Sequence, residues 1–230
     1  MKTNFKSIYE FPKNKIERIY FSFIWIIRIL LVTALVIEGF YQQWEFFFVT
    51  TLALILTLLP AFFEKKLNIK TPPGFHFFIV VFIYAGIYLG EVRDFYYRFF
   101  WWDTMLHTLA GFAMGLIGFA IIFLFHKANK IKAHPFIIAL FAFCFSNTLS
   151  VIWEIFEFSM DTFFGLNMQK VHIGTGVTDT MIDMIVNAIG ALFASIIGYH
   201  YLKTGKSKIY RRTINFLLKE NSHLINKKSK

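Results

Sequence analysis

The sequence predicts an all-α membrane protein, a polytopic bundle of six transmembrane helices. Hydrophobic residues make up 57% of the 230-residue chain, aromatic residues 20% and charged residues only 17%. The mean hydropathy is +0.55, and the 31 phenylalanines exceed what the core of a soluble domain of this size needs. The apolar residues also form six runs, each long enough to cross the hydrocarbon core of a bilayer as a helix. We therefore expect one membrane domain and no second fold.

The six runs define the expected spans, which lie at 20–40, 44–63, 75–90, 103–125, 135–153 and 180–202. They form a membrane domain over 20–202, between a basic N-terminal segment at 1–19 and a basic tail at 203–230. Both flanking segments are expected to be interfacial. So is 91–102, because Tyr, Phe and Trp gather at the boundary between membrane and water.

Two local patterns refine this plan. Arg28 lies inside the first span, and we expect its long side chain to snorkel toward the basic side. Apolar residues recur at helical spacing in the tail and predict a surface amphipathic helix there, with Tyr210, Ile214, Leu217 and Leu218 on one face.

The basic residues lie on one side of the predicted bundle. The N-terminal segment, the loops 64–74 and 126–134 and the tail together hold 20 of the 24 Lys and Arg. Because cytoplasmic loops carry the excess of Lys and Arg, both termini are expected in the cytoplasm. The formal net charge of +10 would suggest nucleic acid in a soluble protein. Here it belongs to a membrane face, so the expected partner is the lipid bilayer and not nucleic acid.

Acidic residues gather at the opposite ends of the spans. Two trios recur at intervals of three or four residues, so that each follows one helix face: Glu154, Glu157 and Asp161, then Asp179, Asp183 and Asn187. Carboxylates in an apolar protein are costly to keep, so these trios are the first place to look for function.

The fourth span adds Asp103 and His107 on one face, which Gly111 and Gly115 continue. Glycines at this spacing let a neighbouring helix approach closely, so we expect the fourth helix to meet the fifth and sixth along this groove. That packing would bring His107 and the acids together at the level of the outer leaflet. Glycine pairs of this kind, including Gly86 with Gly90, also leave an oligomer open.

Several carboxylates at one level must share protons, pair with a base or hold a cation. Carboxylates, an amide and one imidazole favour Mg²⁺, Mn²⁺ or Ca²⁺, with Zn²⁺ open through His107. The candidate metal ligands are Asp103, His107, Glu154, Glu157, Asp179 and Asp183. The candidate catalytic residues are His107, Asp103, Glu157 and Asp183. Asp161, Asn187 and Glu91 complete the expected polar site.

Structural roles compete with these assignments. Asp103 and Asp179 both begin helices, where a carboxylate can cap N–H groups and face the positive end of the helix dipole. His107 could instead form a hydrogen bond between helices. Asp183 and Asn187 lie a turn or two inside the last span, where solvation at the headgroups does not account for them.

Three sequence blocks resemble a known family: WDTMLHTLAGFAMGLIGFA, VIWEIFEFSMDTFFGLNMQ and DTMIDMIVNAIGA. They are similar to the YjdF-like family of bacterial inner-membrane proteins, over roughly 20–202, and the likeness implies a multi-pass protein of that membrane. A looser likeness is to VanZ-like membrane proteins, carried by Asp103/His107, Glu154/Glu157 and Asp183/Asn187/Gly190. Those chains usually have Gln where this one has Glu157. The namesake of that group is linked to glycopeptide-antibiotic resistance, which implies work on the cell envelope.

Three functions fit these observations. The first is an integral membrane enzyme, with or without a divalent metal, that acts on a lipid or lipid-linked envelope substrate through the acids and His107. The second is a small cation- or proton-coupled transporter that uses the same carboxylates. The third is a non-catalytic envelope scaffold that binds through the aromatic segment. The enzyme is the preferred hypothesis.

Overall fold

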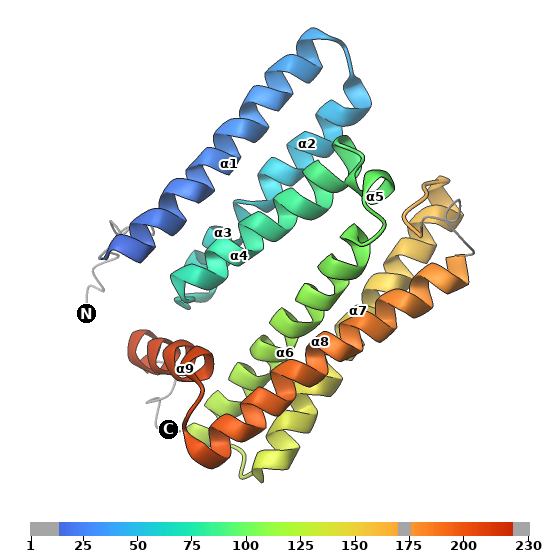
Figure 1. The fold of residues 1–230 in the computed structure, drawn as a ribbon. Coiled ribbons are helices and arrows are strands. Elements are labelled where there is room, and N and C mark those ends of the chain that lie inside the picture. Colours follow the sequence, from blue (N-terminus) through green and yellow to red (C-terminus); the bar gives the residue numbers. More distant parts are fainter. Residues whose placement is uncertain (1–13, 170–175, 223–230) are drawn as a thin grey trace. The chain divides into compact units, whose positions relative to one another are not determined.

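The computed structural model describes residues 14–169 and 176–222 (Figure 1). Every regular element within these residues is helical, and six stretches are long and apolar enough to cross a membrane: Lys15–Phe40, Trp44–Leu67, Pro73–Val92, Trp102–Lys127, Pro135–Phe164 and Gly176–Thr204. The predicted all-α fold with six membrane spans is confirmed.

The chain divides into two compact units, Met1–Phe99 and Phe100–Lys230. Unit 1 contains α1 (Lys15–Phe40), α2 (Trp44–Leu56), α3 (Leu59–Leu67), α4 (Pro73–Ile83), the π-helix η1 (Tyr84–Val92) and the short α5 (Phe95–Arg98). Unit 2 contains α6 (Trp102–Lys127), α7 (Pro135–Phe164), α8 (Gly176–Thr204) and α9 (Lys208–Glu220).

In unit 1 the second span is broken between α2 and α3, and Arg28 of α1 packs at the break. Pro60 lies in the first turn of α3, and a proline inside a continuous helix would remove a hydrogen bond and clash with the preceding turn. Arg28 is buried, and its Nη2 donates to the Thr57 carbonyl at 2.8 Å. The expectation that Arg28 snorkels is therefore wrong, because its guanidinium binds the main chain at this break.

Unit 2 is built on three long helices, α6, α7 and α8, that pack along one another (Figure 1). Their contact follows the glycines of α6. A Cβ atom at Gly111 would lie 2.1 Å from the Asn187 carbonyl oxygen, and one at Gly115 would lie 2.8 Å from Ala194 Cβ. Gly118 packs in the same way on Phe145 of α7. The expected glycine groove is therefore occupied by helices of the same chain.

Helix α7 is longer than the span predicted at 135–153. It continues to Phe164 and ends at Gly165, whose φ of +66° is the left-handed conformation that commonly terminates helices. The sequence after Trp153 remains rich in apolar residues and holds neither proline nor glycine before Gly165. As a result, Glu154 and Glu157 lie within a continuous helix and not beyond its end.

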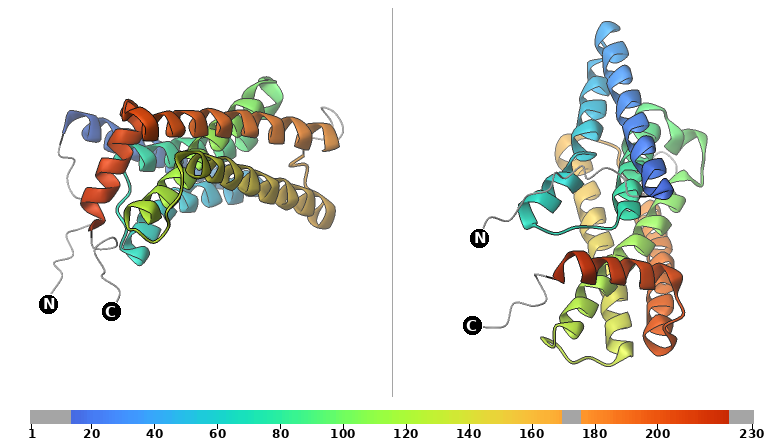
Figure 2. Two further views of the ribbon diagram at one scale, coloured as in Figure 1. Left: turned by 90° about the horizontal axis from the view of Figure 1, so that it is seen from below. Right: turned by 90° about the vertical axis from the view of Figure 1, so that its left-hand side faces the viewer.

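The amphipathic helix predicted in the tail is α9, which begins at the N-cap Ser207. It is steeply inclined to α8 (Figure 2). Its apolar residues Tyr210, Ile214 and Leu217 are buried against a cluster that includes Phe119. The Tyr210 hydroxyl donates to the Ala194 carbonyl at 2.6 Å. The apolar face of α9 therefore packs against the helices of unit 2.

Candidate metal centre

The acids and the histidine of unit 2 come together at one end of its three long helices. Asp103 and His107 lie in the first turns of α6, and Asp183 lies near the start of α8. Helix α7 runs toward this end (Figure 1), and Glu154 and Glu157 lie in its second half. Of the residues expected to converge, the structure brings His107 together with Asp103, Glu154 and Asp183.

His107 is the centre of this group. Its Nε2 lies 3.5 Å from Asp103 Oδ1 on the same helix and 3.9 Å from Asp183 Oδ2 on α8. Its Nδ1 lies 3.8 Å from Glu154 Oε1 on α7. The two ring nitrogens of one imidazole therefore lie near carboxylates from three helices.

The exposed fraction of the side chains increases from the α7 and α8 residues of the group to Asp103. Asp183 is 2% exposed, Glu154 4% and Asn187 3%, while the side chains of His107 and Asp103 are 13% and 25% exposed. The α7 and α8 sides of the group are therefore closed, and the group opens toward Asp103.

Several buried polar atoms of the group have no hydrogen-bond partner among the described residues. They are Asp183 Oδ2, Asn187 Nδ2 and both carboxylate oxygens of Glu154, although the Thr180 side chain of α8 lies close enough to interact with Glu154. An unsatisfied buried polar atom costs about 1–3 kcal/mol, and more when it is charged. Atoms of this kind in three neighbouring side chains indicate that the site is shaped for a group that supplies the missing interactions.

Glu157 and Asp179 extend the group. The Trp153 indole Nε1 donates to Glu157 Oε1 at 2.9 Å and fixes the side chain. Asp103, Asp179, Glu154 and Glu157 all lie near enough to Asp183 to interact with its charge. Four carboxylates thus act on the buried Asp183 side chain, and their repulsion must be relieved by shared protons, by His107 or by a cation.

The structure does not bring Asp161 into this group, and the place of Glu91 relative to the group stays a prediction. Both oxygens of Asp161 accept main-chain hydrogen bonds, from Met168 N at 2.7 Å and Gln169 N at 2.9 Å. Asp161 therefore holds the segment that follows α7. Glu91 is an exposed residue of η1, which belongs to unit 1.

The geometry suits a metal ion. One donor atom each from Asp103, His107 and Asp183 lie within 4.8 Å of one another. Donors bound to one ion at about 2.1 Å lie roughly 3–4 Å apart, so small side-chain rotations would close the set. The remaining ring nitrogen, Nδ1, faces Glu154. Metal-binding histidines generally direct their second ring nitrogen at a carboxylate or carbonyl in this way.

A row of buried polar side chains continues from this group, and its members Ser150 and Ser195 were not predicted from the sequence. Ser150 and Ser146 precede Glu154 on α7, and both are buried, as is Ser195 on α8. Ser146 Oγ donates to the Gly111 carbonyl at 2.9 Å, whereas the hydroxyls of Ser150 and Ser195 have no partner among the described residues. The spacing 146, 150, 154, 157 follows one helix face, so this signal was present in the sequence.

Comparison with known proteins places this geometry in a family. The family model described as predicted membrane protein (DUF2238) matches residues 23–204, which include the whole group around His107. The chain belongs to this family. An uncharacterized protein of Thermotoga maritima is 28% identical over 148 residues, which cover 64% of this chain and 72% of that protein. No solved structure matches the chain.

The family description supports a membrane protein and names no reaction. It carries neither the YjdF-like nor the VanZ-like name, so both likenesses stay predictions.

Proposed function

We propose that this protein is an integral membrane enzyme in which the His107 group holds a divalent cation and acts on the phosphate of a lipid or lipid-linked envelope substrate. The observation that carries the proposal is the position of the His107 ring. Its Nε2 faces Asp103 and Asp183, and its Nδ1 faces Glu154. Two carboxylates and an imidazole would bind the ion, and Glu154 would orient the imidazole.

The type of ligand narrows the choice of ion. Carboxylate oxygens suit Mg²⁺, Ca²⁺ and Mn²⁺, while imidazole suits Zn²⁺ and other transition metals. A mixed set of two carboxylates and one imidazole therefore favours Mn²⁺ or Zn²⁺ over Mg²⁺ or Ca²⁺. Bound there, the ion would neutralise a phosphate oxygen and lower the pKa of a coordinated water.

The charge of the site also requires a cation if the substrate is a phosphate. The group contains Asp103, Glu154, Glu157, Asp179 and Asp183, all close enough to interact. An anionic substrate would be repelled by these side chains alone. Glu157, held by the Trp153 indole, is the carboxylate placed to take a proton from an attacking water.

The surroundings of the site favour a substrate that is anchored in the membrane. The outer side of α7 next to Glu154 and Glu157 is apolar, with Ile152 55% exposed, Trp153 47% and Phe156 45%. In a membrane-spanning helix these side chains face lipid. An acyl or prenyl chain lying against them would leave its polar head at the level of Glu154 and Glu157.

The distribution of Lys and Arg supports an orientation with both termini in the cytoplasm, which would put the His107 group at the outer leaflet. The likeness to bacterial inner-membrane proteins supports that membrane as the location. The looser likeness to VanZ-like proteins supports a cell-envelope substrate. Lipid, and not nucleic acid, is the partner that this arrangement favours.

Metal binding by purified protein tests the proposal. We expect the protein in detergent to bind about one Mn²⁺ or Zn²⁺ per chain in calorimetric titration, and Asp183→Asn to weaken binding at least roughly tenfold because one charged ligand is lost. Asp161→Asn is the matched control, since Asp161 binds the main chain after α7. Its affinity should match that of the unaltered protein. Absence of metal binding by the unaltered protein would overturn the metal centre.

A second assay tests the reaction. Release of inorganic phosphate from a long-chain lipid diphosphate in mixed micelles should depend on the added metal. It should fall at least a hundredfold in Glu157→Gln, in line with the loss of a general base. Metal binding with no turnover of any lipid phosphate would retain the ion site and reject the enzyme.

The row of buried polar side chains on α7 and α8 favours a second candidate, a cation or proton pathway. Beyond Glu154 and Asn187, the buried hydroxyls of Ser150 and Ser195 have no hydrogen-bond partner among the residues that the structure describes. An apolar cluster lies farther along these helices, with Ile138 and Ala142 of α7 buried in it and Ile197 of α8 packed against it. It would have to open for transport. Ion-dependent flux in proteoliposomes that Ser150→Ala and Asp183→Asn both abolish would favour the pathway over the enzyme.

A further inference from the structure

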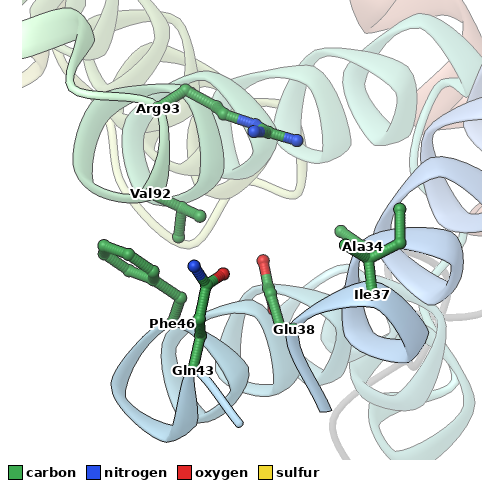
Figure 3. Close-up of a pocket in the computed structure, with 7 residues that line it drawn as sticks. All are labelled: Ala34, Ile37, Glu38, Gln43, Phe46, Val92 and Arg93. Atoms are coloured by element: carbon green, nitrogen blue, oxygen red, sulfur yellow. The ribbon is translucent and has the colours of Figure 1, made fainter. Parts of the chain in front are cut away.

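Unit 1 contains a polar cavity of its own, at the end of α1 where the chain turns into α2. The cavity measures about 150 Å³. Three of its polar side chains are Glu38 of α1, Gln43 of the turn and Arg93, which directly follows η1 (Figure 3). All belong to Met1–Phe99, so this cavity is described independently of the His107 group.

Glu38 carries an unsatisfied charge in this cavity. The residue is 5% exposed, and its Oε1 accepts a hydrogen bond from Thr50 Oγ1 at 3.0 Å. Its Oε2 has no partner within the described parts of the chain. The carboxylate points into the cavity, toward the side on which Arg93 lies (Figure 3). A buried carboxylate with one satisfied and one unsatisfied oxygen is costly, unless a cationic donor occupies the cavity.

Arg93 lies across the cavity from Glu38 (Figure 3). Its Nε and Nη2 donate to the Tyr88 hydroxyl at 3.2 and 2.9 Å, and its guanidinium lies over the Tyr88 ring. A guanidinium has more N–H donors than these two bonds use. Tyr88 therefore fixes the side chain and leaves donors for an anion.

The π-helix sets this position. The Arg93 N–H continues the i→i−5 pattern by donating to the Tyr88 carbonyl at 3.1 Å. A π-turn changes the face on which the following residues lie, and such turns are frequent at functional sites. Val92 and Arg93 reach the cavity on the altered register.

We propose that this cavity binds a small zwitterion, with an ammonium group on Glu38 and a phosphate on Arg93. A single cation would pair with Glu38 alone and a single anion with Arg93 alone, whereas a zwitterion pairs with both side chains. Arginine binds phosphate oxygens through paired N–H groups. The side-chain amide of Gln43, beside Glu38 (Figure 3), supplies both a donor and an acceptor.

This ligand chemistry has two sources, a free phosphorylated amine or the headgroup of an aminophospholipid. Ile37, Phe46 and Val92 supply apolar walls around the charged groups, and these walls suit the short methylene linker that joins amine to phosphate in either source. The experiment must therefore contain both sources. The inference does not rest on the metal centre or on its function.

Calorimetric titration of the full chain in detergent tests the proposal, with phosphoethanolamine, ethanolamine and inorganic phosphate as separate probes. We expect phosphoethanolamine to bind at least roughly tenfold more tightly than either single ion, because it uses both charged walls. In the second arm, phosphatidylethanolamine and phosphatidylglycerol with the same acyl chains compete in mixed micelles. If the protein prefers phosphatidylethanolamine to phosphatidylglycerol but does not bind free phosphoethanolamine, the ligand is the lipid headgroup.

The variants identify the two walls. Glu38→Gln keeps an oxygen for Thr50 but removes the charge, so it should erase the preference for phosphoethanolamine over inorganic phosphate. Arg93→Gln should instead weaken the binding of both phosphoethanolamine and inorganic phosphate at least roughly tenfold. The controls are Glu45→Gln and Arg98→Gln, which alter exposed side chains at the start of α2 and in α5. They should leave the affinities for phosphoethanolamine and for inorganic phosphate unchanged. A change in thermal stability alone would not alter the ratio between probes.

Two results would overturn the proposal. The first is that phosphoethanolamine binds no more tightly than ethanolamine or inorganic phosphate, and that phosphatidylethanolamine is not preferred to phosphatidylglycerol. The second is binding that Glu38→Gln and Arg93→Gln both leave unchanged, which would place the ligand elsewhere.

Discussion

Gly111 of α6 packs directly on the main-chain carbonyl of Asn187 in α8. A Cβ atom at Gly111 would lie 2.1 Å from that oxygen. The contact is reciprocal, because a Cβ at Gly190 of α8 would lie 2.1 Å from the Thr108 carbonyl oxygen of α6. This crossing lies one turn from His107 and Asp183, so the packing of the two helices sets the distance between the candidate ligands.

Gly111→Ala is therefore expected to force α6 and α8 apart. Overpacking against rigid backbone costs about 1–3 kcal/mol, which should lower the midpoint of thermal unfolding in detergent. The same variant should weaken metal binding, since His107 and Asp183 lie on the separated helices. Gly39→Ala is the control, because its Cβ would meet Phe47 at an ordinary 3.6 Å. Equal unfolding midpoints for the two variants would contradict the close crossing.

The sequence predicted this crossing because glycine spacing is a local pattern with a direct packing consequence. The same holds for the six spans, for α9, and for the meeting of His107 with the acids. It could not predict that α7 continues to Phe164, because the apolar residues around Glu154 and Glu157 suit either a helix end or a helix interior. The decisive signal was Gly165, the first residue able to adopt the left-handed conformation easily.

Partners distant in sequence were harder to predict. Nothing local shows that the oxygens of Asp161 are used by the main chain of Met168 and Gln169, since an acid on the same helix face looks equivalent to Glu157. Nor could hydropathy show that Arg28 binds the Thr57 carbonyl, because this contact joins residues that are 29 positions apart in the sequence. The cavity of Glu38 and Arg93 likewise depends on the π-helix η1.

Asp161→Ala is expected to loosen the segment after α7 and to leave the metal centre intact. The substitution removes both acceptors that hold the N–H groups of Met168 and Gln169. Limited proteolysis should then cut this segment several times faster than in the unaltered protein, because cleavage needs local opening. Asp161→Asn, which keeps one oxygen acceptor, should fall between the two. Loss of metal affinity in Asp161→Ala would instead make Asp161 part of the ion site.

Arg28→Met is expected to destabilise unit 1. The methionine fills part of the apolar volume but leaves the buried Thr57 carbonyl without the donor it has at 2.8 Å. An unsatisfied buried acceptor costs about 1–3 kcal/mol, so thermal unfolding in detergent should begin at a lower temperature. Arg18→Met, at an exposed position of the same helix, should change the midpoint little. If Arg28 snorkelled to the headgroups, the two variants would behave alike.

Tyr210→Phe is expected to weaken the docking of α9 and to change the alkaline stability of the protein. The substitution deletes the hydrogen bond from the buried hydroxyl to the Ala194 carbonyl, which is worth about 1 kcal/mol. Burial also raises the pKa of Tyr210 above its ordinary value near 10. The unfolded chain therefore loses this proton at a lower pH than the folded protein does.

The sign of the pH effect follows from that difference. Below about pH 10 the phenol is protonated in both states, and Tyr210 contributes its full stability. Above it the unfolded state binds fewer protons than the folded state, so this contribution declines as the pH rises toward the folded pKa. Thermal unfolding between pH 8 and 11 should show a steeper loss for the unaltered protein than for Tyr210→Phe. Parallel curves would mean that the phenol is solvated and that α9 does not bury it.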